Sequence, residues 1–277
     1  MGIHWSKYSF TFNEIYQNSI VPKTLPKADV HAYLQQKKLI NPNKFLTIHK
    51  QVLTLFIDLH KPVEQLRKDM NRTTRYQINK ASRDGLHVQF ITEPLLKDIE
   101  EFAAFFNPFA KEKNIESCKM GKLISFMNLG KLVITYVFHK DGRKLASHLY
   151  TITGKRAIML YSCSGRFANS DIPNLEIGRA NRYLHWQDIL FFKNQEFDTY
   201  DFLGLSIDAN NEPQQNINKF KQGFGGFQVI EYHSYVPQNI RGKLLLLALK
   251  VKWRKQPELI RGNLLPVSQY LTTVENR

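Results

Sequence analysis

The sequence predicts an α/β (α+β) fold in which a mixed, mostly antiparallel central sheet carries helices on both faces. Apolar segments separated by the turn pairs Asp141-Gly142 and Gly154-Lys155 are typical of an antiparallel meander. We expect these three strands at residues 131–139, 144–153 and 156–164. The meander follows a strand and two helices and precedes a helix and two further strands. A doubly wound nucleotide fold would instead alternate strand and helix throughout.

The other elements follow from hydrophobic periodicity and from helix end signals. The clearest is a helix that starts at Pro62, a residue favoured at first helical positions, and stops before Gly85. Helices are expected at residues 28–38, 61–84, 92–113 and 174–194. Additional strands are expected at 45–49, 52–58, 199–205 and 228–236. The polar stretch that follows the strand at 199–205 is expected to be a loop.

Composition indicates a globular chain of 277 residues, 43% of them hydrophobic. We expect an N-terminal extension over 1–44, one main domain over 45–236 and a basic amphipathic helical segment over 237–277. The net charge of +15 favours a polyanionic partner, although a generally basic surface would give the same value. The two cysteines, Cys118 and Cys163, indicate neither a disulfide framework nor a metal site. Without a signal-like apolar core, a cytoplasmic location is expected.

Residues 240–255 are apolar in the middle and basic at both ends. This stretch is too short to cross a bilayer, which takes about 20 apolar residues. It either packs on the domain or on a second subunit, or lies along a membrane surface as a peripheral contact.

The most informative motifs are YDFLGL at 200–205 and NINKFKQGFGG at 216–226. Closely spaced glycines allow the backbone to approach a ligand or to bend sharply. Lys221 lies between Phe220 and Phe224, so a cation faces a partly apolar wall. This pattern indicates a site for an anionic or carbonyl-bearing substrate.

These motifs, together with RTTRYQINKASRDG at 72–85 and the element order, resemble the GNAT superfamily and, within it, the Fem-type branch that builds peptidoglycan cross-bridges. The resemblance covers about residues 53–236. Fem-type enzymes generally carry two GNAT-like domains, whereas we expect one here. The resemblance implies a GNAT-like sheet and transfer of an acyl or aminoacyl group to an amine of a bacterial cell-envelope precursor, such as an amino sugar or a peptidoglycan peptide. The donor would be acyl-coenzyme A as a co-substrate or aminoacyl-tRNA, with no tightly bound cofactor and no metal.

The resemblance also assigns candidate residues. Lys221 would stabilise negative charge, Phe220 would shape the wall, and Tyr161 would protonate the leaving group, with backbone amides near 161–163 facing the carbonyl. Asp201 and His185 are candidates for the base, although each could equally be structural. Donor phosphates would lie at the start of the helix at 174–194, where Leu175 and Glu176 depart from the family pattern. The residues that would bind the donor are Gly178, Arg179, Ala180, Arg182 and Arg166, and those that would bind the acceptor are Arg75 and Arg72.

The leading hypothesis from the sequence is therefore an N-acyltransferase. A non-catalytic, degenerate GNAT module that binds RNA or anionic lipid is the alternative. Zinc-protease and serine-hydrolase signatures are absent from the sequence.

Overall fold

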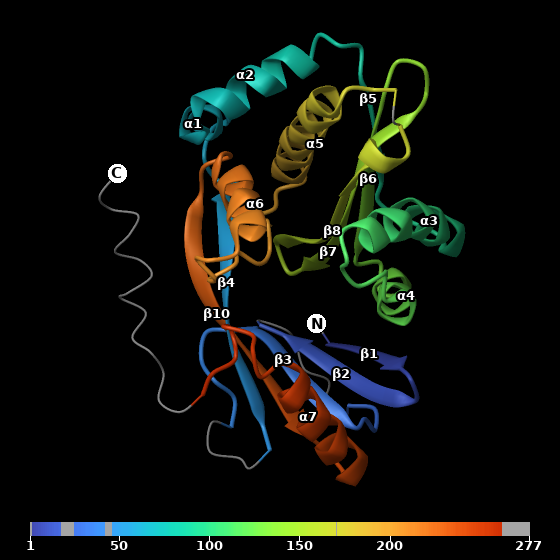
Figure 1. Cartoon of the computed structure of the whole chain (residues 1–277), viewed down its shortest axis with the longest axis vertical. Helices are drawn as coiled ribbons and strands as arrows, with labels where there is room; N and C mark the ends of the chain where they lie inside the picture. Colours follow the sequence, from blue (N-terminus) through green and yellow to red (C-terminus); the bar gives the residue numbers. More distant parts are fainter. Residues whose placement is uncertain (1, 18–24, 42–45, 170, 262–277) are drawn as a thin grey trace. The chain divides into compact units, whose positions relative to one another are not determined.

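The computed structural model describes residues 2–17, 25–41, 46–169 and 171–261. Contacts within the chain divide it into two compact units (Figure 1). Unit 1 comprises Met1–Thr54, Gly204–Asn218 and Val229–Arg277. Unit 2 comprises Leu55–Leu203 and Lys219–Gln228. The domain boundaries expected from the sequence stay a prediction, because packing units are not the same as independent domains.

Unit 2 contains a mixed, mostly antiparallel sheet with strand order β4-β9-β8-β7-β6-β5, to which β4 contributes only its end from Leu55 onward. Neighbouring strands are antiparallel except β8 and β9, which run parallel. The strands are β4 (Ile48–Asp58), β5 (His87–Ile91), β6 (Leu132–Phe138), β7 (Lys144–Thr153), β8 (Arg156–Ser164) and β9 (Thr199–Asp201). The helices are α1 (Val63–Asp69), α2 (Arg72–Ala81), α3 (Leu96–Glu112), α4 (Met120–Asn128) and α5 (Asn174–Asn194), with a short 3₁₀ turn, η1 (Gly165–Phe167).

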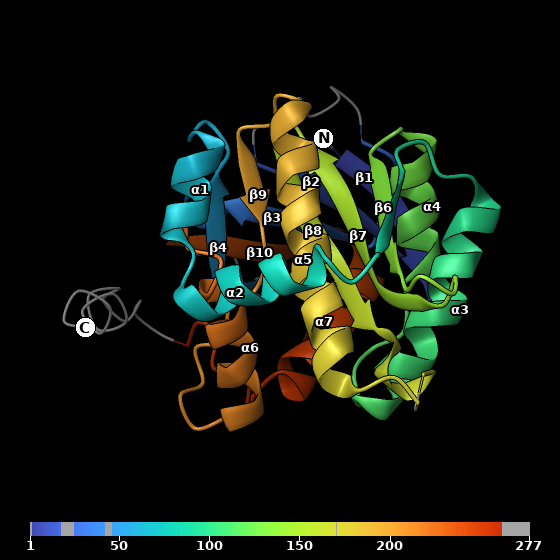
Figure 2. The ribbon, with the colours of Figure 1, turned by 90° about the horizontal axis from the view of Figure 1, so that it is seen from above.

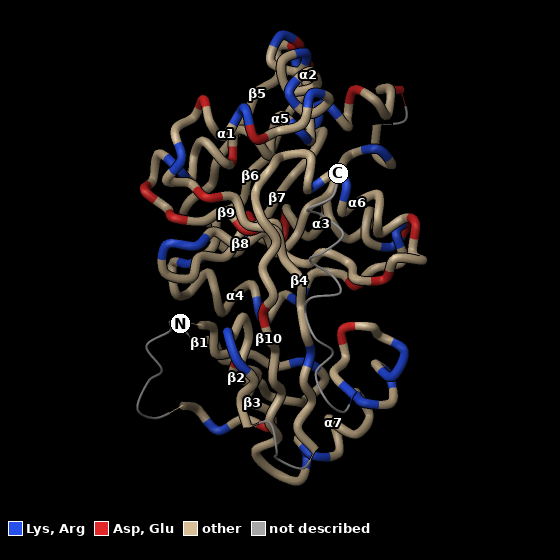
Figure 3. The backbone as a smooth tube through the Cα atoms, turned by 90° about the vertical axis from the view of Figure 1, so that its left-hand side faces the viewer, with Lys and Arg blue, Asp and Glu red and all other residues tan. Residues whose placement is uncertain are grey.

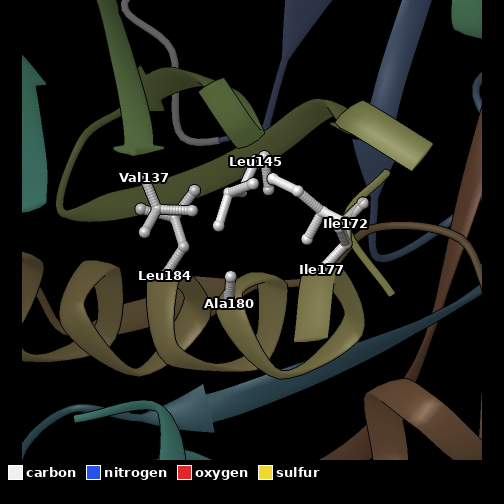
Figure 4. Close-up of a cluster of buried hydrophobic side chains, with 7 residues drawn as sticks. Val137, Leu145, Ile172, Ile177, Ala180 and Leu184 are labelled. Atoms are coloured by element: carbon white, nitrogen blue, oxygen red, sulfur yellow. The ribbon is translucent and has the colours of Figure 1, made fainter. Parts of the chain in front are cut away.

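Helices cover both faces of this sheet, as the sequence predicted. Helix α5 lies on one face, and α3 and α4 lie on the other (Figures 1 and 2). The first half of α5 places Ile177, Ala180 and Leu184 against Val137 and Leu145 of the meander (Figure 4). Burying Ile177 and Leu184 contributes roughly 1.5–3 kcal/mol each, which stabilises the packing of α5 on the sheet.

Unit 1 is built on β1 (Gly2–Lys7), β2 (Phe10–Tyr16), β3 (Val30–Gln36) and β10 (Phe227–Pro237). In this unit β1 pairs with β2 antiparallel, β2 with β3 parallel, and β3 with β10 antiparallel. Helix α7 (Ile240–Lys252) packs Leu246 on Val30 and Ile48. Helix α6 (Glu212–Gln222) begins in unit 1 and ends in unit 2.

Most elements of the central region are confirmed. Helix α5 has the expected bounds, and α3, the meander, β9, β10 and α7 occur where they were expected. The strand expected at 199–205 is shorter, because its pairing with β8 ends at Asp201.

Other expectations were wrong. Residues 28–38 form β3 rather than a helix, because this segment pairs with both β2 and β10. The two strands expected between 45 and 58 are one continuous strand over its described residues. The helix expected at 61–84 is broken at Met70, which is extended, and Asn71 then caps α2 by accepting the Thr74 N–H. Helix α6 replaces most of the loop expected before Gly223, and β1, β2, β5 and α4 were not expected.

Candidate active site

A connected set of buried polar side chains lies in unit 2 between α5, β7 and β9. Helix α5 places Asn181, His185 and Asp188 at positions i, i+4 and i+7, so they share one face. Strand β7 contributes His148 and Tyr150. These residues are two apart on the strand, so both side chains point to the sheet face that α5 covers. Strand β9 adds Tyr200. These side chains are buried, except that Asn181 is half-buried.

Hydrogen bonds join these residues into a chain, here called the α5 network. Asp188 Oδ2 accepts from Tyr150 Oη at 2.6 Å and lies 2.6 Å from His148 Nδ1. The Tyr150 and Tyr200 hydroxyls are 2.8 Å apart, and Tyr200 Oη is 2.8 Å from His185 Nδ1. The imidazole rings of His148 and His185 stack at 4.0 Å.

The direction of the hydrogen bonds follows from the number of protons. Tyr150 donates its one hydroxyl proton to Asp188, so Tyr200 must donate to Tyr150. Tyr200 has then used its proton and accepts from His185 Nδ1–H. A neutral His185 in this tautomer carries its lone pair on Nε2, which is the form that a proton acceptor requires.

The electrostatic environment agrees with a neutral His185. Burial lowers the pKa of His185 well below its usual value, and the positive charges of Lys221 and Arg182 contribute to the same shift. Burial and the Asp188 carboxylate raise the pKa values of Tyr150 and Tyr200, so both phenols stay protonated. The α5 network can therefore hold a proton acceptor in one tautomer near neutral pH.

The same region contains a group that could bind a metal ion. Ligand atoms of His148, His185 and Asp188 lie within 4.8 Å of one another. However, His148 Nδ1 and Asp188 Oδ2 are hydrogen bonded to each other, and His185 Nδ1 is used by Tyr200. Because these ligand atoms already make hydrogen bonds, the arrangement is typical of a hydrogen-bonded network rather than of a metal site.

Lys221 lies on the last turn of α6, next to the carboxyl end of β9. Its Nζ donates to the Leu203 carbonyl at 2.6 Å, and the Leu203 N–H donates to Asp201 Oδ1 at 2.8 Å. Leu203 has φ +51°, a left-handed conformation that is rare for a leucine and costs about 1–3 kcal/mol. Two hydrogen bonds thus hold a strained residue between Asp201 and Lys221.

Asp201 is fully buried, and Arg156 Nε donates to its Oδ2 at 3.0 Å. The carboxylate is committed to an ion pair and to the Leu203 backbone, which favours a positioning role over the base role. Burial lowers the pKa of Lys221 to about 8, an effect that the Asp201 charge opposes.

Phe220 lies between the cation of Arg182 and the ring of His185. The Arg182 guanidinium carbon is 4.5 Å from the Phe220 ring centre, and the His185 and Phe220 ring centres are 5.5 Å apart. Burial lowers the pKa of Arg182, and within the described part of the chain its buried Nε has no hydrogen-bond partner. Of the residues selected from sequence, the structure therefore brings together Phe220, Lys221, Arg182 and His185.

The glycines after Lys221 have a structural explanation. A Cβ at Gly223 would lie 2.6 Å from Thr74 Oγ1, and one at Gly225 would lie 2.7 Å from the Asp69 carbonyl oxygen. A Cβ at Gly226 would lie closer still to the carbonyl oxygen of Phe56. The sharp bend expected here is present, and the backbone that approaches these glycines belongs to the α1–α2 junction and β4.

The candidate donor residues are spread along the start of α5. Ala180 belongs to the apolar core, Gly178 has open space around its Cα, and Arg179 lies 3.8 Å from Asp84. Arg166, on the preceding 3₁₀ turn, donates to the Ser164 hydroxyl. A cavity of about 400 Å³ adjoins this helix end. It is lined by Arg83, Asp84, Gly85, His139, Lys140 and Glu176.

Strand β8 departs from regular pairing where the candidate amides lie. Leu149 pairs with Tyr161 and Tyr150 with Met159, so Leu160 is an extra residue that forms a β-bulge. The parallel pairing with β9 stops at Ile158 among the described residues. The Tyr161 ring packs on Phe106 of α3, on the sheet face opposite α5, so Tyr161 is separated from Phe220 and Lys221.

The candidate acceptor arginines lie on α2. Arg75 Nη1 donates to carbonyls at the end of α1, including Lys68 O at 3.1 Å and Met70 O. This contact satisfies backbone groups that the end of a helix leaves unpaired. Arg72 is exposed in the first turn of α2.

Sequence reasoning missed His148, Tyr150, Asp188 and Tyr200. A signal existed, because α5 carries His185 and Asp188 on its buried face and β7 carries a histidine and a tyrosine two residues apart. One sequence alone could not show that these two elements would face each other.

Comparison with solved structures confirms the fold. FemX superposes with a TM-score of 0.59 at 11% identity, covering 88% of this chain and 85% of that chain. The C-terminal domain of an Agrobacterium fabrum protein named as a lysylphosphatidylglycerol synthetase superposes with a TM-score of 0.50 at 15% identity, covering 80% and 72%. No protein-family model matches the sequence. No curated protein matches it either. The chain therefore shares its fold with FemX and with this C-terminal domain.

Proposed function

We propose that this protein is an N-acyltransferase that moves an acyl or aminoacyl group onto an amine. The observation that carries the proposal is the grouping of Phe220, Lys221 and Arg182 around a neutral, buried His185. Nearby, the parallel pairing of β8 with β9 ends at Ile158 among the described residues. Acyl transfer needs a proton acceptor for the amine, a cation near the developing charge and a bound carbonyl.

The proposed reaction joins the amine nitrogen to the carbonyl carbon of the donor and breaks the bond from that carbon to sulfur or oxygen. His185 Nε2 takes the proton of the amine. Lys221 and backbone amides near 161–163 stabilise the negative charge on the carbonyl oxygen. The leaving sulfur or oxygen takes up a proton from water, because the Tyr161 ring packs on Phe106 and is separated from Lys221. Asp201 positions Lys221 through Leu203.

For the donor, we propose an acyl-coenzyme A, bound with its phosphates near the start of α5. Three observations support this placement: Arg182 Nε has no hydrogen-bond partner among the described residues, Arg166 is exposed, and there is open space at Gly178. Arg179 and Ala180 complete the segment. Aminoacyl-tRNA is the second candidate donor. Coenzyme A should raise the melting temperature of the protein if it is the donor. Binding of tRNA should fall steeply as salt is raised, because many phosphates are contacted.

For the acceptor, we propose an amine of a cell-envelope precursor, with Arg72 and Arg75 near its phosphates. A lipid-linked acceptor would be met at a membrane surface, and residues 240–255 are the proposed contact there.

The decisive test measures product formation from coenzyme A thioesters and charged tRNAs with a panel of amines. Lys221→Ala should lower the rate about 100-fold, since it removes a preorganised charge. Lys219→Ala is the matched control, because Lys219 is exposed on the same helix. Full activity in Lys221→Ala would disprove the site assignment.

The alternative function is a non-catalytic module that binds RNA or anionic lipid. The exposed Leu175 and the adjoining Glu176 favour it, because neither residue suits a phosphate site at the start of α5. Ordered coenzyme A next to Arg182 in a crystal would exclude this alternative.

A further inference from the structure

Helix α7 presents a second apolar face to solvent. Its first apolar face is already used within unit 1. There Leu246 is 1% exposed against Val30 and Ile48, and Gly242 packs directly on the backbone of Asp29. The helix is therefore anchored to its unit on one side, and its orientation within that unit is set by core packing.

The outward side of α7 carries an apolar stripe. Ile240, Leu244, Leu247 and Val251 are 73%, 62%, 44% and 64% exposed. Their spacing of four, three and four residues places them on one line along the helix. Single exposed apolar residues are common on protein surfaces, but an aligned row of four large ones marks an interaction surface.

Basic side chains surround this stripe. The exposed cations are Arg241, Lys243, Lys250, Lys252, Arg254 and Lys255, and Arg241 also lies 3.9 Å from the Asp29 carboxylate. Residues 240–255 contain no acidic side chain. Figure 3 shows the Lys and Arg positions along α7. An apolar stripe flanked by cations is complementary to a surface with a negatively charged outer layer and an apolar layer below it.

We propose that the outward stripe of α7 docks on an anionic membrane surface. The stripe would enter the boundary between headgroups and acyl chains, while the lysines and arginines contact lipid phosphates. Spanning is not involved, because no described helix is long and apolar enough to cross a bilayer. The surface lies in unit 1, so this inference does not depend on the transferase reaction.

The test is co-sedimentation of the full-length protein with lipid vesicles. One set is pure phosphatidylcholine, and the other also contains phosphatidylglycerol. The stripe variant combines Leu244→Ser and Leu247→Ser, and the control is Leu175→Ser, whose side chain is 65% exposed on α5. The wild type should bind the anionic vesicles in preference, and the stripe variant should bind them roughly tenfold more weakly. The control should bind like the wild type, and added salt should weaken binding.

Several outcomes would overturn the proposal. They are equal binding by the stripe variant, equal binding to both vesicle types, and no binding by the wild type. A concentration-dependent dimer that the stripe variant loses would assign the stripe to a second copy of the chain. Binding that appears only after removal of residues 262–277 would assign it to that tail. Melting curves check that the variants are folded, and turnover of a soluble amine should be the same in the stripe variant as in the wild type.

Discussion

The two halves of α5 both bury apolar side chains, but they differ in the charged and polar groups buried with them. The first half buries Ile177, Ala180 and Leu184 in an apolar cluster. The second half buries His185 and Asp188 in a hydrogen-bonded network, beside the apolar Ile189 and Phe192. Apolar burial is favourable without any partner. A buried polar group costs free energy unless its hydrogen bonds are made, so the second half depends on β7 and β9 for its stability. The second half of α5 therefore adds a set of buried hydrogen-bonded groups to the apolar packing that both halves share.

The largest effect is expected when the charge at the centre of the network is removed. Asp188→Ala leaves His148 and the Tyr150 hydroxyl buried without their shared acceptor. The free energy of unfolding should fall by about 3–5 kcal/mol, measured by urea denaturation. Asp188→Asn, which keeps an acceptor oxygen, should cost less. A loss below about 1 kcal/mol in Asp188→Ala would mean that the network is not a stabilising unit.

A substitution in the apolar cluster at the first half of α5 is the counterpart of Asp188→Ala. Leu184→Ala should lower the free energy of unfolding by about 3 kcal/mol, because it removes a fully buried side chain and leaves a cavity. Folded Leu184→Ala protein should keep its turnover. If turnover falls as far as it does in network variants, the two halves do not have separate roles.

A smaller structural effect with a larger catalytic one is expected from Tyr200→Phe. The change removes one hydroxyl, which should cost about 1–2 kcal/mol of stability. It also removes the group that orients His185, so turnover of the amine should fall about 100-fold. Tyr183→Phe, on a partly exposed residue of α5, is the control. Unchanged turnover in Tyr200→Phe would argue against His185 as the base.

The smallest effect concerns Lys221 and pH. Its pKa is about 8 in the folded protein and about 10.5 when unfolded. Between these values the unfolded chain binds more protons, so stability rises with pH in this window. Between pH 7.5 and 10.5 the free energy of unfolding of the wild type should rise by about 1 kcal/mol relative to that of Lys221→Met. The value is smaller than the full pKa shift implies, because the side chain is partly exposed and solvent screens its charge. Parallel stability curves for the two proteins would contradict a lowered pKa.

Local sequence signals were sufficient for the elements that do not depend on distant partners. The bounds of α5 and the meander could be predicted from periodicity and turn residues. Residues 28–38 could not, because their two partner strands come from opposite ends of the chain. The break at Met70 lies in an otherwise helical pattern, and it is held by a contact of Asn71 N–H with the distant Gly223 carbonyl.

The residues of the candidate site also fall into two groups, those that the sequence could select and those whose role only the contacts show. Phe220, Lys221 and Arg182 could be selected from motifs and resemblance, and the structure brings them together. Asp201 and the glycines after Lys221 also stood out, but their contacts show that they hold the backbone.

The sequence by itself determined the three meander strands and the helices α3, α5 and α7, and it selected candidate residues for acyl transfer. Only the tertiary structure decided that His185 is buried in one tautomer and that α7 turns a stripe of apolar side chains outward. The physical reason is that periodicity reports which side chains share a face, whereas burial and the direction of hydrogen bonds depend on what packs against that face.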